Sequence, residues 1–212
     1  MKEYQKIETL YKFDSAKKGF TSEFYNPIVA YLKDLPWYGT EKIDGTNIRV
    51  LWNGHTFTFS GRTDDSVLPL EVKALLESTF DYNMEVSIEQ KFGEKEVMFF
   101  MEAYGGKVQN GTYSGNERLI GFDISIGGIY LDKLVSQQIF TQLFLPFVPI
   151  TYYETLSEAI AYVKTNPMSK VDPTAHIEGL VCVPQMRIYD HMGNRIIVKI
   201  KVKDLNKLLK GE

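Results

Sequence analysis

A lysine near the start of the chain has the surroundings of a covalent nucleophile. Lys42 opens the run KIDGTN, residues 42–47, in which Gly45 permits a turn between two strand-like stretches. A lysine that attacks an electrophile needs a neutral amine, and burial or neighbouring cations favour that form by lowering the pKa. An exposed lysine in a β-turn is the simpler account of Lys42 taken alone. The run becomes informative only together with its companions.

Further short runs carry polar or aromatic residues at the ends or on the faces of predicted strands. In chain order these residues are Arg62 in SGRT, Glu102 after FFM, Phe122 and Asp123 in GFDI, Glu178 in EGLV, and Lys199 and Lys201 in VKIK. Side chains alternate along a strand, so Lys199 and Lys201 are expected to share one face. By the same rule, Phe122 and Asp123 are expected to point to opposite faces.

The elements that must position these residues are mostly strands. Strand-like runs lie at 48–52, 55–60, 97–103, 118–126, 148–153, 179–183 and 195–201, and helical periodicity lies at 70–79, 134–143, 156–166 and 204–210. Asn53-Gly54 predicts a hairpin, and residues 127–128 and 190–194 are typical of turns. Because regular helices do not separate the strands, we predict an α+β fold of antiparallel sheets flanked by helices, in one domain over residues 1–212.

Composition excludes several classes of protein. With 24 basic and 27 acidic residues the net charge is −3, so a polyanion must be held by a local patch rather than by the overall field. Cys182 is the single cysteine, which excludes an internal disulfide and a cysteine-based zinc site. No signal peptide, membrane span or P-loop motif is present. We therefore expect a cytoplasmic protein, in the cytoplasm of the host cell if a virus encodes it.

Taken in this order, the runs resemble the five nucleotide-binding motifs of the covalent nucleotidyltransferase superfamily of polynucleotide ligases and capping enzymes. DNA ligases usually have Lys-x-Asp-Gly-x-Arg, whereas the RNA-ligase-2-like branch, found in phages and in kinetoplastid editing ligases, ends the motif in Gly-Thr-Asn. Asn47, the spacing to Arg62 and the pair Phe122-Asp123 resemble that branch. The resemblance implies an adenylation-domain fold. Since 11 residues follow Lys201, no appended OB or helical domain is expected.

The resemblance implies ATP-dependent joining of RNA ends in three steps. Lys42 attacks the α-phosphorus of ATP to give lysyl-AMP, AMP passes to a 5′-phosphate end, and a 3′-hydroxyl attacks the activated end and releases AMP. Mg²⁺ is the implied metal, with Mn²⁺ as a substitute, because the α-phosphate gathers negative charge in each transition state. The implied partners are RNA ends or a nicked duplex, in RNA repair.

The resemblance also implies roles for individual side chains. The implied catalytic residues are Lys42, Glu178, Lys199 and Lys201. The implied metal ligands are Glu178 and Asp44. The implied nucleotide-binding residues are Glu41, Ile43, Asn47, Arg62, Glu102, Phe122, Lys199 and Lys201, with the ring of Phe122 stacked on adenine and Glu102 at the ribose. Some of these residues also have a structural interpretation, with Phe122 as a core ring and the two lysines as the solvated face of an edge strand.

Other interpretations stay open. The chain could be a minimal ATP-dependent DNA ligase, a capping guanylyltransferase, or a catalytic fragment that needs a partner domain or protein. It could also be a non-catalytic module that binds RNA ends and retains the fold. In a stand-alone ligase, the basic run over residues 195–210 would hold the nucleic acid, and binding would then weaken steeply with salt.

Overall fold

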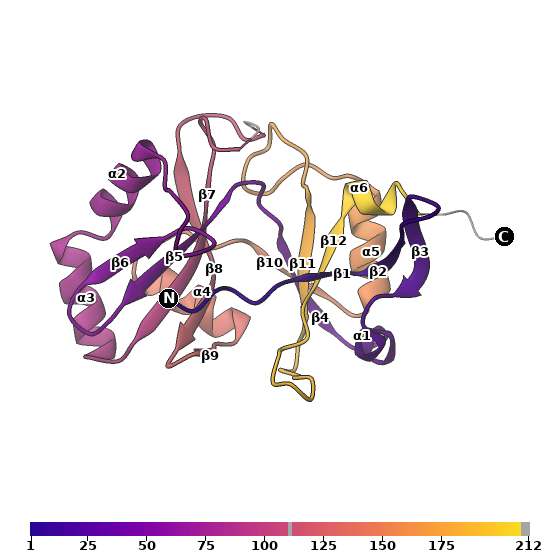
Figure 1. Ribbon diagram of the computed structural model, residues 1–212, viewed down its shortest axis with the longest axis horizontal. Helices are drawn as coiled ribbons and strands as arrows, with labels where there is room; N and C mark the ends of the chain where they lie inside the picture. The colour runs from indigo at the N-terminus through magenta and orange to yellow at the C-terminus, as the bar shows by residue number, and fades with distance from the viewer. Residues whose placement is uncertain (110–111, 209–212) are drawn as a thin grey trace. The chain divides into compact units, whose positions relative to one another are not determined.

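The computed structural model describes residues 1–109 and 112–208 (Figure 1). Its segments alternate along the sequence between two units, each with its own sheet and core. Unit 1 contains Met1–Tyr4 and Asp44–Val148, and unit 2 contains Gln5–Ile43 and the residues from Pro149 onward. The predicted α+β fold of antiparallel sheets flanked by helices is confirmed. A single domain over the whole chain stays a prediction.

Unit 1 is built on a five-stranded antiparallel sheet in the order β6-β5-β7-β8-β9. Its elements are β5 (Thr46–Trp52), β6 (Phe57–Ser60), α2 (Leu70–Thr79), α3 (Tyr82–Phe92), β7 (Val97–Tyr104), β8 (Arg118–Ile126), β9 (Ile129–Tyr130) and α4 (Lys133–Gln142). The predicted hairpin at Asn53-Gly54 joins β5 to β6. Gly127 and Gly128, both with positive φ, form the predicted turn between β8 and β9.

The sheet of unit 1 has two unlike faces. The core face packs against α2, α3 and α4 through apolar side chains, among them Val50, Trp52, Phe99, Met101 and Ile124 from strands and Val72, Leu76, Ile88 and Phe140 from helices. The other face, here called the site face, carries Asn47, Arg49, Glu102, Phe122 and Asp123, as the strand register and side-chain contacts require. Polar residues predicted from the sequence are thereby gathered on one side of one sheet.

A β-bulge in β8 overturns one prediction. Met101 pairs with Gly121 and Phe100 pairs with Asp123, so Phe122 is an extra residue in the ladder. An extra residue breaks the alternation of side chains, and Phe122 and Asp123 therefore both lie on the site face, where Tyr4 contacts each of them. The expectation that they point to opposite faces is wrong, because the alternation rule assumes an uninterrupted strand.

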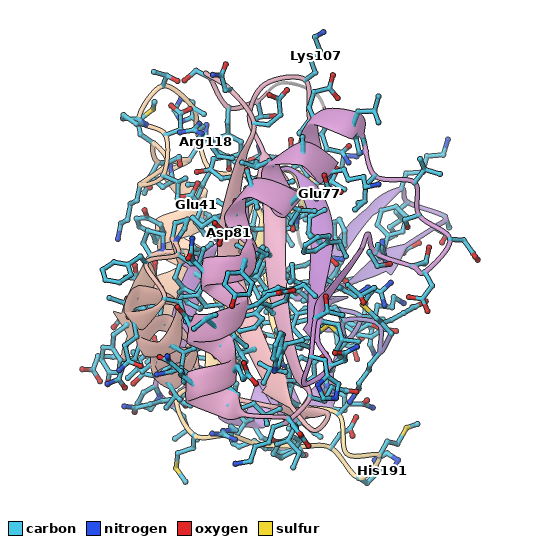
Figure 2. All side chains as sticks on the ribbon, turned by 90° about the vertical axis from the view of Figure 1, so that its left-hand side faces the viewer. Glu41, Glu77, Asp81, Lys107, Arg118 and His191 are labelled. Atoms are coloured by element: carbon cyan, nitrogen blue, oxygen red, sulfur yellow. The ribbon has the colours of Figure 1, made fainter. Side chains whose placement is uncertain are left out.

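Helix α3 was not predicted, although both of its ends carry recognisable signals. Asp81 precedes the helix, and its carboxylate accepts a hydrogen bond from the backbone N–H of Met84 at 3.0 Å (Figure 2). Gly93 ends the helix with φ of 60°. The helix buries only one side chain, that of Ile88, and so needs few apolar residues at helical spacing. The residues at its two ends therefore indicate this helix better than its hydrophobic periodicity does.

Unit 2 is built on a sheet in the order β1-β12-β11-β4-β10, antiparallel except for the parallel pair β1 and β12. Its elements are β1 (Glu8–Thr9), β2 (Tyr11–Asp14), β3 (Gly19–Phe24), α1 (Pro27–Leu32), β4 (Trp37–Glu41), β10 (Ile150–Tyr153), α5 (Leu156–Lys164), β11 (Gly179–Pro184), β12 (Val198–Lys201) and α6 (Val202–Leu205). Strands β2 and β3 form a separate hairpin.

One face of this second sheet is covered by helices. The core there joins sheet residues such as Trp37, Leu180, Val198 and Ile200 to helix residues such as Val29, Leu156, Ile160 and Leu205. The predicted strand at 195–201 is shorter in the structure, where β12 begins at Val198. The predicted helix at 204–210 begins two residues earlier as α6, and residues 209 and 210 lie outside the described part of the chain.

Candidate active site

Unit 2 brings three of the predicted catalytic residues into direct contact. The Nζ atom of Lys42 lies 2.6 Å from Oε2 of Glu178, and Nζ of Lys201 donates a hydrogen bond to Oε1 of the same carboxylate. Lys42 directly follows β4, Glu178 directly precedes β11, and Lys201 ends β12. Because these three strands are neighbours in the sheet, residues 136 and 23 positions apart in sequence meet at one carboxylate.

A glycine makes this meeting possible. The backbone N–H of Lys42 donates to the carbonyl of Gly179 at 2.9 Å, which fixes the start of β11 beside the end of β4. A Cβ atom added at Gly179 would lie 2.0 Å from the carbonyl oxygen of Ile200 on the neighbouring strand. Any larger residue would therefore push β11 from β12 and separate Glu178 from Lys201.

The ionisation of Glu178 and Lys201 is set by their contact. Burial alone would raise the pKa of Glu178, but hydrogen bonds from Lys201 and Lys42 outweigh it and lower that pKa below its usual value. Burial alone would lower the pKa of Lys201, but the hydrogen bond and the charge of Glu178 outweigh it and raise that pKa. The carboxylate and the ammonium group thus stay charged over a wider pH range than usual.

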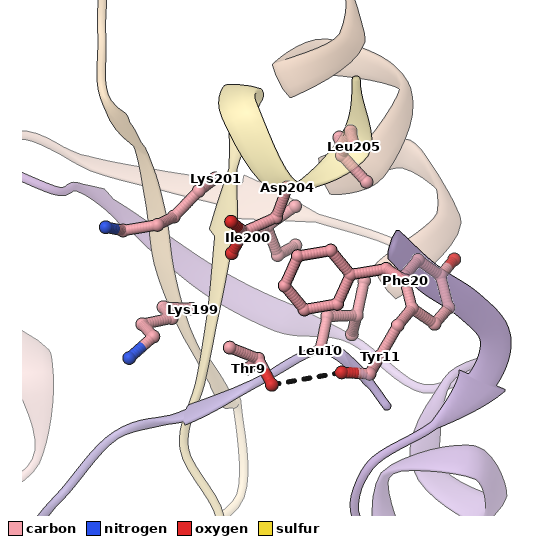
Figure 3. Close-up of a pocket in the computed structure, with 9 residues that line it drawn as sticks. All are labelled: Thr9, Leu10, Tyr11, Phe20, Lys199, Ile200, Lys201, Asp204 and Leu205. Atoms are coloured by element: carbon pink, nitrogen blue, oxygen red, sulfur yellow. Dashed lines mark hydrogen bonds between the residues drawn. The ribbon is translucent and has the colours of Figure 1, made fainter. Parts of the chain in front are cut away.

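Lys199 stands beside these groups on the same strand face, as predicted. Figure 3 shows the amines of Lys199 and Lys201 extending to the same side of β12, while Val198 and Ile200 are buried on the other side. Burial lowers the pKa of Lys199, and the positive charges of Lys201 and Lys42 lower it further. Two neighbouring cations beside Lys42 form a local field suited to an anionic ligand.

The two residues that flank Lys42 are buried. Glu41 pairs in register with Leu180, a core residue, so its side chain lies on the helix-covered face, away from Lys199 and Lys201. There its Oε2 accepts the backbone N–H of Lys170 at 3.0 Å. Ile43 is 5% exposed. Nucleotide contacts by Glu41 and Ile43 stay predictions, and the described contact of Glu41 is structural.

Unit 1 gathers a second group of predicted residues on its site face. Asn47 and Glu102 are direct cross-strand partners, and Glu102 also pairs with Ile120, two positions before Phe122. Among the residues that the structure describes, the buried Oδ1 atom of Asn47 accepts no hydrogen bond. A buried amide oxygen without a donor is costly, so this atom is suited to a ligand that supplies one.

Gly45 serves a purpose other than the turn that the sequence indicates. Its φ is not in the left-handed region, but a Cβ atom added there would lie 2.2 Å from the carbonyl oxygen of Ala103 on β7. The glycine therefore permits close packing of the chain against β7. Next to it, Asp44 accepts a hydrogen bond from the hydroxyl of Thr112 at 2.7 Å.

Arg62 lies in an exposed loop whose base is fixed by a residue that the sequence does not mark. Arg49 is fully buried, and its guanidinium donates to the carbonyl of Gly61 at 2.7 Å, to Oγ of Ser60 at 2.8 Å and to Oδ1 of Asp64 at 2.8 Å. It also donates to the carbonyls of residues 1 and 2. In the alternating run that forms β5, Arg49 has the pattern of an outward-facing residue, and only tertiary contacts reveal its burial.

The described residues hold no preformed metal cage. No group of three or more His, Cys, Asp or Glu side chains is close enough together within residues 1–109 and 112–208 to bind a metal ion. Mg²⁺ commonly uses one or two carboxylates and completes its shell with water and substrate phosphates. The lone carboxylate of Glu178 fits that mode. No helix in the described part of the chain has the length and apolarity to cross a membrane.

The basic run at 195–210 is not one continuous surface. Arg195 is 8% exposed, and its backbone carbonyl accepts a hydrogen bond from Gln5 at 2.7 Å. Lys199 and Lys201 belong to the cluster around Glu178, whereas Lys203 and Lys207 are exposed. Lys210 lies outside the described residues. The described cations that remain available at the surface are therefore fewer than the sequence indicates.

Comparisons with known proteins agree with this architecture. A family profile described as RNA ligase matches residues 35–201. No curated protein matches the chain. The fold is similar to a variant of Naegleria gruberi RNA ligase with AMP and Mn, with a TM-score of 0.66 and 16% identity over 94% of this chain and 60% of that one. The same enzyme with PPi gives a TM-score of 0.67 and 17% identity over the same shares.

A third structure, a variant of the Naegleria gruberi enzyme with ATP and Mn, gives a TM-score of 0.67 and 16% identity. It is matched over 94% of this chain and 59% of its own length. The chain thus spans about three fifths of the length of the solved structures that it resembles. At such identities the likeness establishes the fold.

Proposed function

The chain belongs to the RNA ligase family, and from that premise we propose that it is an ATP-dependent RNA ligase. It would join 5′-phosphate and 3′-hydroxyl ends of RNA breaks through lysyl-AMP and an adenylylated 5′ end, as part of RNA repair in the cytoplasm. The observation that carries the proposal is the contact of Lys42 with Glu178, which Lys201 shares and Lys199 adjoins. Nucleotidyl transfer to lysine requires an amine, a carboxylate and nearby cations, and all of these groups are present here.

In the first step, the amine of Lys42 would attack the α-phosphorus of ATP. A nitrogen–phosphorus bond forms, the bond from the α-phosphorus to the bridging oxygen breaks, and pyrophosphate leaves with the bonding electrons. Lys42 must lose a proton to the surroundings, and Glu178 is a poor acceptor because its pKa is lowered. A divalent cation at Glu178 would supply charge against the α-phosphate and compete with Lys42 for the carboxylate oxygens.

The cations on β12 would act on the transferred phosphate throughout the reaction. Lys201 and Lys199 extend to the same side and would stabilise the charge that the α-phosphate gathers in each transition state. In the second step a 5′-phosphate oxygen displaces Lys42 from the phosphorus. In the third step a 3′-hydroxyl attacks the activated 5′-phosphorus, and AMP leaves.

The residues of unit 1 would bind the nucleoside and the RNA end. Phe122, partly exposed on the site face, would stack on adenine, and Glu102 would accept hydrogen bonds from the ribose hydroxyls. The free Oδ1 of Asn47 would accept a donor from the nucleotide, and Arg62 would contact phosphate. Asp44 as a second metal ligand is part of the same proposal.

The pH dependence of the first step should identify Lys199. Its lowered pKa means that Lys199 is charged below that value and loses its charge as the pH rises through it, below the usual lysine range. The rate of lysyl-AMP formation should therefore fall on the alkaline side earlier than an ordinary lysine would require. In Lys199→Arg the guanidinium stays charged far into the alkaline range, and the alkaline limb should move to higher pH.

The control for this profile is Lys164→Arg, on the exposed side of α5, whose pH–rate curve should match the wild type. The absolute rate of Lys199→Arg is not the criterion, because arginine and lysine differ in shape. An alkaline limb that stays in place in Lys199→Arg would assign it to another group.

A labelling experiment tests the proposed function directly. The protein is incubated with ATP labelled at the α-phosphate and with Mg²⁺ or Mn²⁺, and then with a nicked duplex that carries RNA on the 3′-hydroxyl side. The expected result is a covalent, acid-labile label on the protein that passes to the 5′-phosphate end and disappears as the nick is sealed. A γ-labelled sample should leave the protein unlabelled, because pyrophosphate departs.

Other outcomes of the same experiment would replace the proposal. Sealing that requires only deoxyribose termini would indicate a DNA ligase, and labelling by GTP in preference to ATP would indicate a capping enzyme. Binding of ATP without covalent transfer would indicate a non-catalytic RNA-end module. Label transfer that stops at the adenylylated end would indicate that a partner domain supplies the last step.

A further inference from the structure

We propose that Tyr4, Asp123 and Lys133 form a polar network, centred on a buried carboxylate, that positions the ring of Phe122 for the nucleobase. The inference rests on the proposed function, in which Phe122 is the platform for adenine. Tyr4 and Lys133 lie outside every sequence motif. All four residues belong to unit 1.

The centre of the network is the carboxylate of Asp123. Asp123 is fully buried, and its Oδ2 accepts hydrogen bonds from the hydroxyl of Tyr4 at 2.7 Å and from Nζ of Lys133 at 3.3 Å. The side chain of Lys133 is 4% exposed. A buried carboxylate is tolerated when it is paired and hydrogen-bonded, and Lys133 and Tyr4 supply both contacts at Oδ2. The carboxylate of Asp123 is thus enclosed by the protein.

Lys133 also holds the backbone of the residue that it would position. Its Nζ donates to the carbonyl oxygen of Phe122 at 2.7 Å, from the first turn of α4. Phe122 is the extra residue of the β-bulge, so its carbonyl is not held by a regular ladder. One ammonium group therefore joins the backbone at Phe122 to the carboxylate of the next residue, and this fixes the direction in which the bulge turns the ring.

Tyr4 acts on the ring itself. Its ring meets Phe122 edge to face, with centroids 5.1 Å apart and an interplanar angle of 84°, and it contacts Phe100 at 4.8 Å. Phe100 lies behind Phe122 at 6.4 Å and 30°. Because the hydroxyl of Tyr4 is bonded to Asp123, the ring of Tyr4 is held at one orientation, and Phe122 can rest against it. Tyr4 and Lys133 are therefore positioning residues.

Two variants separate the parts of the network. Lys133→Met removes both hydrogen bonds and keeps most of the length of the side chain, whereas Tyr4→Phe removes one hydroxyl and keeps the ring. The readouts are the KM and kcat for ATP in lysyl-AMP formation, and the quenching of a fluorescent adenine analogue, 2-aminopurine riboside triphosphate, on binding. Loss of stacking on an aromatic ring typically weakens the binding of a base about 5- to 150-fold.

A partly misplaced ring should therefore raise the KM for ATP about tenfold in Lys133→Met, with kcat within about twofold of the wild type. The quenching should decrease in parallel, and Tyr4→Phe should show a smaller change in the same direction. The reference for complete loss is Phe122→Leu. The matched control is Lys73→Met, an exposed lysine of α2 that should leave both readouts at the wild-type value. A purely structural role would lower thermal stability without changing the quenching per bound nucleotide.

The outcomes distinguish this inference from the proposed function. If Phe122→Leu impairs ATP binding while Lys133→Met and Tyr4→Phe behave as the wild type, the positioning network is wrong and the ligase proposal stands. If Phe122→Leu has no effect on ATP binding, the platform and the network are both wrong, while label transfer to Lys42 still tests the ligase. Should Lys133→Met not fold, Tyr4→Phe alone decides the question.

Discussion

Lys42→Ala is expected to form no covalent adenylate and to seal no RNA that carries an ordinary 5′-phosphate. The expectation follows from the position of the amine, which is the nucleophile of the first step and the leaving group of the second. The fold should survive, because Glu178 keeps Lys201 as its counter-ion. The same variant should still seal a 5′ end that has been adenylylated chemically, because the third step requires no bond to Lys42.

The measurement compares the two substrates side by side. Label transfer from α-labelled ATP and sealing of a 5′-phosphorylated nick report the first two steps, and sealing of a pre-adenylylated nick reports the third. Lys164→Ala, an exposed lysine of the same unit, is the matched control and should retain all three. A covalent label on Lys42→Ala would place the nucleophile elsewhere and overturn the central assignment.

Glu178→Gln should lower the rate of lysyl-AMP formation by about 10²–10³-fold, the usual effect of removing one group that stabilises charge at the reacting centre. The amide is neutral and offers one acceptor oxygen where the carboxylate offers two, so Lys42 and Lys201 can no longer each pair with a charged oxygen of their own. It is also a much weaker ligand for a divalent cation. The concentration of Mg²⁺ or Mn²⁺ needed for half-maximal rate should rise together with the loss of rate.

Titration of the metal at saturating ATP measures both changes. Glu77→Gln, which alters an exposed carboxylate on α2 (Figure 2), should leave both unchanged. If Glu178→Gln keeps the wild-type rate and metal dependence, Glu178 is only a counter-ion of the lysines, and the metal lies elsewhere.

The stabilisation that Glu178 contributes, measured as the difference between wild type and Glu178→Gln, should also depend on pH. Because contact with Lys201 and Lys42 lowers the pKa of Glu178 in the folded protein, its contribution to stability is fully present above the pKa of the unfolded chain. That contribution is lost as the pH falls through the lowered pKa. The difference in free energy of unfolding between wild type and variant should therefore be largest near neutral pH and shrink in strong acid.

Sequence patterns were sufficient where a local rule governs the outcome. The predicted bounds of β8 and α2 agree with the structure, and the alternation in β12 correctly placed Lys199 and Lys201 on one face. The resemblance of the ordered motifs to the nucleotidyltransferase superfamily implied that Lys42 and Glu178 share one site, and the two side chains are in contact in the structure. Alternation carries this information because it is a property of an uninterrupted strand.

The remaining features depend on contacts between distant segments. Arg49 is buried because residues 1, 2, 60, 61 and 64 supply its acceptors, and nothing near it in sequence indicates them. Lys133, at the start of α4, resembles an ordinary surface lysine until Asp123 is found beside it. The passage of the chain between the units after Tyr4, Ile43 and Val148 has no linker composition. Local sequence patterns therefore cannot predict these contacts between distant residues.

The bulge in β8 sets a limit on how regular this protein can be. An ideal strand offers each face only every second position, so it can present either an aromatic ring or a carboxylate at this height of the sheet, but not both. Removing one residue at the bulge would complete the ladder and leave every other side chain on its present face. The result would be a regular sheet that presents only one of the two residues, Phe122 or Asp123, on the site face. The irregular hydrogen bonding of the bulge therefore allows two residues that are adjacent in sequence to lie on the same face.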